Sequence, residues 1–281
     1  GEVGAVSEKR SLWQRLMLDL RKAPMTARFG MIVILGYIIL AVFAPILSPY
    51  GEAEVFPEPY AAWSAEHVFG TDQIGRDIFS RMIFGARNTV GIAVATTLLA
   101  FIIGGSLGLA AAINQSWLDQ FLSRAVDVLM AIPSLIFALV LLSIFGSTVT
   151  NLIIIIAVLD STRVFRLTRA VSLNVVVMDY VEAARLRGEG LWWIMRREIL
   201  PNIMPPLIAE FGLRFCFVFL TIAALSFLGV GIQPPTADWG SMVRENASLI
   251  MFAQYDIKAG LTPLLPAAAI ALLTVAINFV V

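Results

Sequence analysis

Few side chains in this sequence are capable of covalent chemistry. The chain has one cysteine, Cys216, and one histidine, His67. Cys216 lies in an apolar stretch with no histidine to activate its thiol, so a catalytic nucleophile is not indicated. Two such ligands are too few for an ordinary zinc site, and we expect His67 to be a solvated loop histidine. The chain also lacks a Gly-x-x-x-x-Gly-Lys-Ser/Thr phosphate loop. We therefore expect a protein that is not an enzyme and binds no metal or cofactor itself.

The most unusual charged residues lie inside long apolar stretches. Glu210 and Arg214 stand four residues apart in one such stretch, a spacing that lets their side chains pair on a helix. Charges in such surroundings are rare and normally face a bundle interior or a cavity. The pair is either structural, at a subunit interface, or a polar element lining a solute path. Two further pairs are expected to be structural, namely Arg124 with Asp127 and Asp160 with Arg163.

The apolar stretches dominate the composition. Hydrophobic residues make up 59% of the 281 residues, charged residues make up 14%, and mean hydropathy is +0.85. A soluble domain has about 45–50% apolar and about 25% charged residues, so a soluble enzyme and a disordered chain are both excluded. The 20 basic and 20 acidic residues balance, which argues against a nucleic-acid partner. The composition indicates an all-α integral membrane protein in contact with membrane lipid.

The positions of the apolar stretches predict six transmembrane helices. A spanning helix needs about 20 mostly apolar residues. The uncharged run from 128 to 159 is too long for one span, and Gly146-Ser147-Thr148 divides it. Because the sequence begins with glycine and ends inside an apolar run, we expect it to be part of a slightly longer protein. The predicted spans are residues 29–47, 90–113, 121–145, 149–166, 203–227 and 261–281.

Basic residues indicate how these spans are oriented. Lys and Arg are concentrated before the first span and between the fourth and fifth spans. Cytoplasmic loops are enriched in these residues, so both segments and both chain termini are placed in the cytoplasm. The loops at 48–88 and 228–260 then face outward.

The segment before the first span has apolar residues at helical spacing within a basic background. We expect a short amphipathic helix lying on the cytoplasmic lipid surface, where its basic residues suit anionic headgroups. The alternative is that the charges only keep the N-terminus inside. The apolar residues are Leu12, Trp13, Leu16, Met17 and Leu20.

The two outer loops contain further candidate contacts. Asp77 and Arg81 can pair at i, i+4 in an amphipathic helix that we expect on the outer membrane surface, leading into the second span. Trp239, in the second outer loop, follows a stretch rich in proline and glycine. The sequence leaves open whether this tryptophan anchors at the membrane interface or packs against a soluble partner.

The cytoplasmic segment from 174 to 202 predicts a helix, a glycine turn and a second helix. Asp179 and Glu182 have the spacing of a capping box, and Gly188 stands where a left-handed C-terminal residue belongs. The second helix is expected to run from 191 to 199 and to stop at Pro201. Small alanines beside the turn would let another backbone approach closely, which favours a knob fitting a protein groove. An ordinary connecting loop remains the alternative.

The same segment resembles the cytoplasmic EAA loop of ABC-importer permeases. That motif reads Glu-Ala-Ala, three residues, Gly, nine residues, Ile, one residue, Leu, Pro. Here Glu198 stands in place of isoleucine, and a polar residue there is common among peptide-type permeases. The matching residues are Glu182, Ala183, Ala184, Gly188, Leu200 and Pro201.

The outer loops are similar to those of the dipeptide, oligopeptide and nickel group of these permeases. The resemblance covers nearly the whole chain and is closest to the second permease subunit of such importers. The matching sequences are Gly70-Thr71-Asp72, Gly75-Arg76-Asp77, Ser80-Arg81, Gly85-Ala86-Arg87, Pro234-Pro235 and Asp238-Trp239-Gly240.

The resemblance implies a transmembrane subunit of a bacterial inner-membrane importer for peptides or similar small solutes. Its partners would be a second, homologous permease subunit, two cytoplasmic ATPases and an external solute-binding protein. The EAA loop would act as a coupling helix seated in an ATPase, and ATP and Mg would be bound by the ATPases. The alternative from another class is a subunit of an ion-coupled secondary transporter, whose mark would be ion-driven uptake without ATP.

The sequence also divides the chain into three parts. Residues 1–28 form the cytoplasmic N-terminal amphipathic segment. Residues 29–88 contain the first transmembrane helix and the long external loop. Residues 89–281 form the core transmembrane domain of the permease that the resemblance implies.

Overall fold

The computed structural model describes residues 11–281 and is built of helices. Lys9 and Arg10, two of the basic residues expected to hold the N-terminus in the cytoplasm, lie outside the described residues. The elements are α1 (Leu12–Lys22), α2 (Met25–Val42), α3 (Ala44–Leu47), α4 (Ile78–Gly85), η1 (Ala86–Val90), α5 (Gly91–Ile113), α6 (Trp117–Ala131), α7 (Ser134–Phe145), α8 (Val149–Val176), α9 (Asp179–Leu186), α10 (Leu191–Ile194), η2 (Met195–Ile199), α11 (Leu200–Phe227), α12 (Trp239–Asn246), η3 (Ala247–Phe252), α13 (Ile257–Leu261) and α14 (Leu264–Val280). Here η1 and η2 are π-helical turns and η3 is a 3₁₀-helix.

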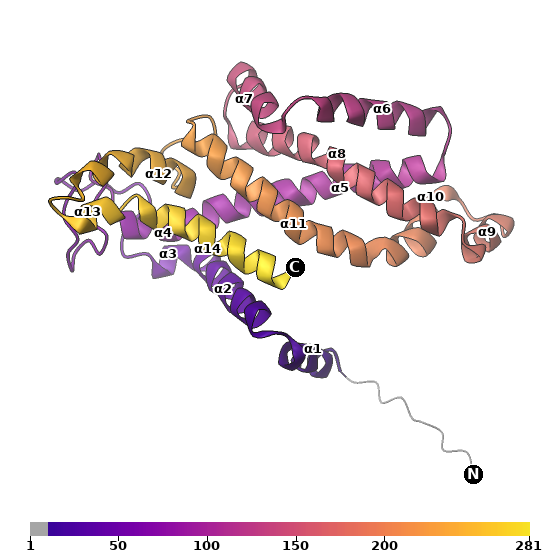
Figure 1. The fold of residues 1–281 in the computed structure, drawn as a ribbon, viewed down its shortest axis with the longest axis horizontal. Coiled ribbons are helices and arrows are strands. Elements are labelled where there is room, and N and C mark those ends of the chain that lie inside the picture. The colour runs from indigo at the N-terminus through magenta and orange to yellow at the C-terminus, as the bar shows by residue number, and fades with distance from the viewer. Residues whose placement is uncertain (1–10) are drawn as a thin grey trace, which may run out of the picture.

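The long helices lie side by side as an elongated bundle. Helices α5, α8 and α11 run through its centre, α14 and α2 lie along one side, and α6 and α7 lie along the other (Figure 1). Helices α9 and α10 lie at one end of the bundle, and α3, α12 and α13 lie at the opposite end (Figure 1). The bundle therefore separates the segment containing Gly188 from the two loops predicted to face outward.

The closest helix pair in the bundle is α5 with α8, and glycines permit that approach. Gly104 and Gly108 lie four residues apart on the face of α5 that meets α8. A Cβ atom added to Gly104 would lie 2.8 Å from Cβ of Val164, and one added to Gly108 would lie 2.8 Å from Cβ of Thr168. Small residues at this spacing let helix backbones pack closely within membranes.

All six predicted spans coincide with helices, although fewer qualify by length and composition. Three helical runs are long and apolar enough to cross a membrane, namely Met25–Val42, Ile78–Ile113 and Leu191–Phe227. A fourth qualifies if the bent pair α6–α7 is one span. Helix α14 is apolar but has 17 residues, and α8 carries four charged side chains, Asp160, Arg163, Arg166 and Arg169.

The expectation of one continuous helix over 121–145 is wrong. Helices α6 and α7 meet at an angle of 89°, with Ile132 and Pro133 between them. Proline has no N–H to continue a helical hydrogen-bond ladder, and its ring clashes with the preceding turn. The physical signal for this break was therefore present at Pro133, inside a stretch whose uniform hydrophobicity suggested continuity.

The expected stop of the second cytoplasmic helix at Pro201 is also wrong. Residues Leu191–Phe227 form one helical run, in which the π-helical turn η2 leads directly into α11. Pro201 lies in the first turn of α11, where a missing N–H and a fixed φ are tolerated. The segment after Gly188 is thus rigidly joined to a long bundle helix.

The N-terminal amphipathic helix is present as predicted. Helix α1 begins after Ser11, whose side chain and that of Gln14 form a capping box. Its apolar residues do not pack into the bundle, and the side chain of Leu12 is 81% exposed. Its position on a lipid surface remains a prediction.

The first outer loop is folded, which corrects two expectations about it. His67 is buried rather than solvated, with its Nδ1 atom 2.9 Å from Oδ1 of Asp77 and its ring against Phe56. Asp77 also accepts hydrogen bonds from the backbone and hydroxyl of Ser80, at 2.9 and 2.7 Å. Asp77 therefore does not pair with Arg81, whose Nη1 donates to the carbonyl oxygens of Glu52 and Pro235 instead.

Helix α4 is largely enclosed by the protein on its apolar and its polar side, and its expected place on the outer membrane surface remains a prediction. Ile78 and Ile83 are buried, but so are Ser80 and Arg81 on its polar side. The helix continues through η1 into α5 as one run, Ile78–Ile113. The two outer loops enclose α4, because they supply the carbonyl oxygens of Glu52 and Pro235 that accept hydrogen bonds from Arg81, the charged residue of this helix.

Trp239 packs inside the protein, so neither expectation for it is correct. Its side chain is buried, its Nε1 donates to the carbonyl oxygen of Met82 at 3.0 Å, and its ring contacts Tyr37 edge-on.

Charged side chains link the two outer loops. Arg76 of the first loop donates to Asp72 at 2.7 Å and lies 3.4 Å from Glu245 of the second. Burial raises the pKa of the Glu245 carboxyl above its usual value, although the nearby Arg76 and Arg81 oppose that rise. The two outer loops thus form one lobe.

Candidate functional site: the glycine turn and the charge cluster of the bundle

The turn between α9 and α10 has the geometry that its glycine predicted. Gly188 has φ +79°, in the left-handed region. Its N–H donates to the carbonyl oxygen of Arg185 at 3.0 Å, and the N–H of Glu189 donates to that of Ala184 at 3.2 Å. These bonds satisfy the carbonyl groups left free at the end of α9. The prediction of a left-handed residue at Gly188 is confirmed.

The two alanines of this segment face different ways. Ala183 and Glu182 are exposed, whereas Ala184 is fully buried in a cluster with Val181 and Ile194. Val181 and Ala184 are three residues apart and so share the inner face of α9. The expectation that both alanines present an outer surface is therefore wrong for Ala184, which packs the helix onto the bundle.

The predicted capping box in α9 is absent. The N-cap residue is Met178, and Asp179 and Glu182 both lie in the first turn. Acidic residues there favour the helix through its dipole without capping it. Of the remaining motif residues, Leu200 packs partly buried against the cluster that contains Ala184, and Pro201 is exposed at the start of α11.

The turn also exposes large apolar side chains that the sequence interpretation passed over. Leu186 is 82% exposed and Trp192 is 71% exposed, one on each side of Gly188. Arg187 places its guanidinium over the ring of Trp193. Exposed apolar residues rimmed by charges mark sites of protein or membrane interaction. The available signal was two tryptophans in a loop otherwise rich in charge.

The predicted pairing of Glu210 with Arg214 is confirmed. Nε of Arg214 donates to Oε1 of Glu210 at 2.7 Å, within α11. Nη1 of Arg214 lies 3.7 Å from Oδ1 of Asp160 on α8, and the guanidinium lies over the ring of Phe217. Arg214 therefore joins carboxylates of two helices, and we name Asp160, Arg163, Glu210 and Arg214 the charge cluster.

The other two predicted pairs have different partners from those expected. Asp160 pairs with Arg214 rather than with Arg163. Asp127 pairs with Arg166 of α8 rather than with Arg124. In both cases a side chain of a neighbouring helix offers better geometry than the residue three positions away, because the bundle brings α8 between α6 and α11.

Removing one member of the Glu210–Arg214 pair is expected to lower folded yield more than removing both. Glu210→Gln removes the closest partner of Arg214, and Arg214→Met removes the partner of Glu210, and an unpaired charge in apolar surroundings costs at least about 2.5 kcal/mol on insertion scales. Purified yield of the two single variants and the double variant measures this coupling. If the yield loss of the double variant equals the sum of the losses of the two single variants, Glu210 and Arg214 do not stabilise each other.

Asp160 is a second partner for Arg214 but not for Glu210, so the two single variants are expected to differ in yield. Glu210→Gln leaves Arg214 with Asp160 as a partner at 3.7 Å, whereas Arg214→Met strands two carboxylates. We therefore expect Arg214→Met to give the lowest yield of the three variants. Asp127→Asn is the matched control, because its side chain is 63% exposed and an exposed ion pair contributes about 0–1 kcal/mol.

The arrangement offers contact and charge but no evident catalytic or metal centre. Within residues 11–281, no group of three or more His, Cys, Asp or Glu side chains is placed to hold a metal ion. Cys216 is buried in the core of the bundle. The two features that remain are an exposed turn at one end and a cluster of charges among apolar helices.

Comparison with known proteins identifies the family to which this fold belongs. Residues 104–281 match the family described as binding-protein-dependent transport system inner membrane component. Residues 11–62 match the N-terminal TM domain of oligopeptide transport permease C.

Curated relatives agree with this match over most of their length. The dipeptide transport system permease protein DppC of Alkalihalophilus pseudofirmus is 35% identical, over 88% of this chain and 81% of the relative. The di/tripeptide permease protein DppC of Pseudomonas aeruginosa is 36% identical, over 87% and 83%. The glutathione permease protein GsiD of Pectobacterium atrosepticum is 32% identical, over 96% and 86%. This chain belongs to the inner membrane permease components of binding-protein-dependent transport systems.

Proposed function

We propose that this chain is one half of a heterodimeric channel that imports peptides or similar small solutes. The channel crosses the bacterial inner membrane through six spans of this chain, with both termini in the cytoplasm. A second, homologous permease subunit forms the other half, and an external solute-binding protein delivers the solute. The proposal is supported by family membership, by relatives whose names specify dipeptides, tripeptides and glutathione, and by helices at all six predicted positions.

The turn between α9 and α10 is the coupling element of this proposal. Two cytoplasmic ATPases bind ATP and Mg, and the turn seats in a groove of one of them. Glu182, Ala183 and Gly188 face that groove, and Ala184 anchors α9 to the bundle behind it. The observation that carries the proposal is the unbroken helical run Leu191–Phe227, which begins beside the turn and crosses the bundle. Movement of the turn is thereby transmitted into α11 and tips the spans between inward-open and outward-open states.

The three parts of the chain have separate tasks in this proposal. Residues 1–28 hold the N-terminus at the cytoplasmic lipid surface. Residues 29–88 supply the first span and most of the outer lobe. Residues 89–281 contain the coupling turn and the spans that surround the solute path. Leu200 and Pro201 begin α11, the helix that joins the coupling turn to these spans.

Reconstitution of the complete transporter tests the function directly. The chain is expressed with its partner subunits and inserted in proteoliposomes with the external binding protein. Uptake of labelled dipeptide is expected to require ATP, and dipeptide is expected to stimulate ATP hydrolysis. ATP-independent uptake driven by an ion gradient would overturn the proposal and favour the secondary transporter.

The proposed orientation is checked by the accessibility of two single cysteines. Ala65 and Leu186 are both exposed. Ala65 lies in the loop between α3 and α4, and Leu186 ends α9, which lies at the opposite end of the bundle (Figure 1). In intact spheroplasts, Ala65→Cys is expected to react with an impermeant thiol reagent and Leu186→Cys is expected to react only after lysis. Buried Cys216 provides little background. External labelling of Leu186→Cys would contradict the assigned topology.

A further inference from the structure

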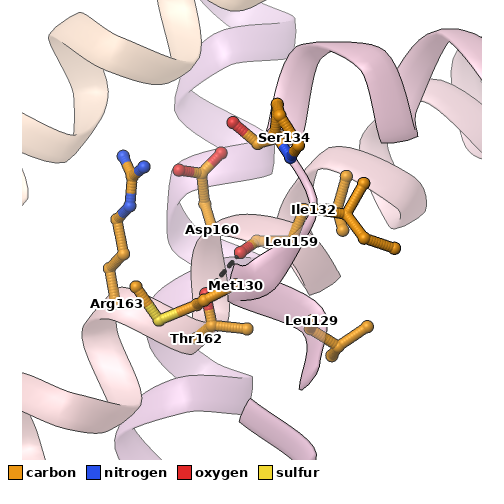
Figure 2. Close-up of a pocket in the computed structure, with 9 residues that line it drawn as sticks. Leu129, Met130, Ile132, Ser134, Leu159, Asp160, Thr162 and Arg163 are labelled. Atoms are coloured by element: carbon orange, nitrogen blue, oxygen red, sulfur yellow. Dashed lines mark hydrogen bonds between the residues drawn. The ribbon is translucent and has the colours of Figure 1, made fainter. Parts of the chain in front are cut away.

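A polar pocket lies at the break between α6 and α7, beside the charge cluster. It has a volume of about 90 Å³, and a single water molecule needs about 10–15 Å³ of such free space. The Ser134 hydroxyl, the Asp160 carboxylate and the Arg163 guanidinium lie close together on one side of the break (Figure 2). Leu129 and Ile132 lie on the other side, and Met130 runs beside Arg163 and Thr162 (Figure 2). The pocket therefore combines a carboxylate, a hydroxyl and a cation where the exposed residues Ser134 and Arg163 meet the partly buried Asp160.

The Asp160 carboxylate has unused capacity to bind a cation. Its side chain is 13% exposed, and within residues 11–281 its ion-pair partner is Nη1 of Arg214, at 3.7 Å. This separation is too long for a hydrogen bond, and Nη1 itself has no hydrogen-bond partner. Arg214 directs its closer contact to Glu210 through Nε, at 2.7 Å. Within residues 11–281 no protein group donates a hydrogen bond to this carboxylate, so its oxygens are free to accept from water or from a ligand with a donor.

The broken helix adds negative potential to the same pocket. The carbonyl oxygen of Leu129 cannot receive the usual helical hydrogen bond, because the residue four positions on is Pro133, which has no N–H. Free carbonyl groups at the end of α6 carry the negative end of its dipole. Thr162 adds no competing donor, because its hydroxyl donates to the carbonyl oxygen of Leu159 at 2.7 Å. Discontinuous membrane helices place such ends at solute sites in transporters.

We propose that this pocket binds the protonated amino terminus of the transported peptide. The inference rests on the peptide-import function proposed above. Asp160 and the free carbonyl groups of α6 receive the ammonium group. Arg163 and the first turn of α7, which begins at Ser134, face the oxygen atoms that follow the amino terminus in a peptide. The site thus recognises the one group that every unmodified peptide shares, whatever its side chains.

Protection of a pocket cysteine from alkylation tests this assignment. Ile132 lines the pocket and is 42% exposed, so Ile132→Cys in the complete transporter is expected to react with a maleimide. Millimolar glycyl-glycine is expected to slow this reaction at least about threefold, and N-acetyl-glycyl-glycine is expected to leave it unchanged. Adding Asp160→Asn is expected to abolish the protection. Modification of residue 132 is followed by mass spectrometry, so cysteines of other subunits do not interfere.

Two further variants keep the test decisive. Asp127→Asn is the control, because this aspartate is exposed on α6, pairs with Arg166 and does not line the pocket. It is expected to retain protection. If Asp160→Asn fails to fold, Ser134→Leu replaces it, because a leucine there fills the pocket without removing a charge. Protection is expected to be lost in that variant.

The outcomes separate the pocket from the proposed function. Uptake of glycyl-glycine by the wild-type transporter is measured in the same preparation. Normal uptake with no protection, or with equal protection by the acetylated peptide, would overturn the pocket assignment and leave the import function standing. Absence of ATP-dependent uptake of any peptide would overturn the import function and the pocket assignment with it.

Discussion

Replacing Gly188 with valine is expected to reduce ATP-dependent uptake at least about tenfold while leaving the spans inserted. Gly188 has φ +79°, a conformation that costs a residue with a Cβ atom about 1–2 kcal/mol, and more for a β-branched side chain. A Cβ atom there would meet no other atom within 4 Å, so the effect arises from the turn itself. The strained turn changes the angle between α9 and α10 and spoils the fit to the ATPase. Uptake and solute-stimulated ATP hydrolysis are measured in proteoliposomes.

Gly190→Val is the matched control for this prediction. Gly190 lies two residues further along the same loop, and a Cβ atom there also meets nothing within 4 Å. Its φ of −71° and ψ of 158° are readily adopted by valine. Gly190→Val is therefore expected to retain most of the activity. If Gly188→Val transports as well as Gly190→Val, the turn is an ordinary connection and has no coupling role.

Local spacing predicted the features that depend on one helix or one turn. The pairing of Glu210 with Arg214 follows from a spacing of four residues, and the left-handed turn at Gly188 follows from a glycine after a short helix. These interactions need only the geometry of a single element. The amphipathic character of α1 belongs to the same class.

Interactions between helices could not be predicted in this way. Asp119 of α6 accepts hydrogen bonds from Nε and Nη2 of Arg169 at 2.6 and 2.8 Å, although the two residues are 50 positions apart. Asp160 likewise pairs with Arg214 rather than with Arg163, which is only three residues away in the sequence. Spacing along a chain identifies neighbours on one helix, but the partner across a helix interface is decided by how the whole bundle packs.

The outer lobe shows the same limit for residues in loops. His67 and Trp239 lie in segments rich in proline, glycine and polar residues, which normally indicate exposed loops. His67 is buried against Tyr50 and Phe56 of its own loop. Trp239 is buried against Tyr37 and Phe219 of the bundle helices. A histidine and a tryptophan within long irregular loops were the available signals of buried residues there, and Trp239 belongs to the main core of the bundle.

The second large effect is expected at Gly104, where valine should reduce the yield of folded protein below about a tenth. The added Cβ atom would approach Cβ of Val164 to 2.8 Å and the backbone nitrogen of Phe165 to 2.9 Å. Backbone atoms of α8 cannot rotate away as a flexible side chain can. Overpacking commonly costs 1–3 kcal/mol even where side chains can adjust, so a contact with a rigid helix exceeds that range. Yield is measured by size-exclusion chromatography of the solubilised protein.

Gly105→Val separates this packing effect from every other consequence of placing valine in α5. Gly105 is the next residue of the same helix, and a Cβ atom there meets nothing within 4 Å. Helix propensity and hydropathy change equally in the two variants, so their difference in yield isolates the α5–α8 contact. Gly105→Val is expected to fold at nearly wild-type yield. Equal yields for the two variants would show that α5 and α8 do not depend on close backbone contact.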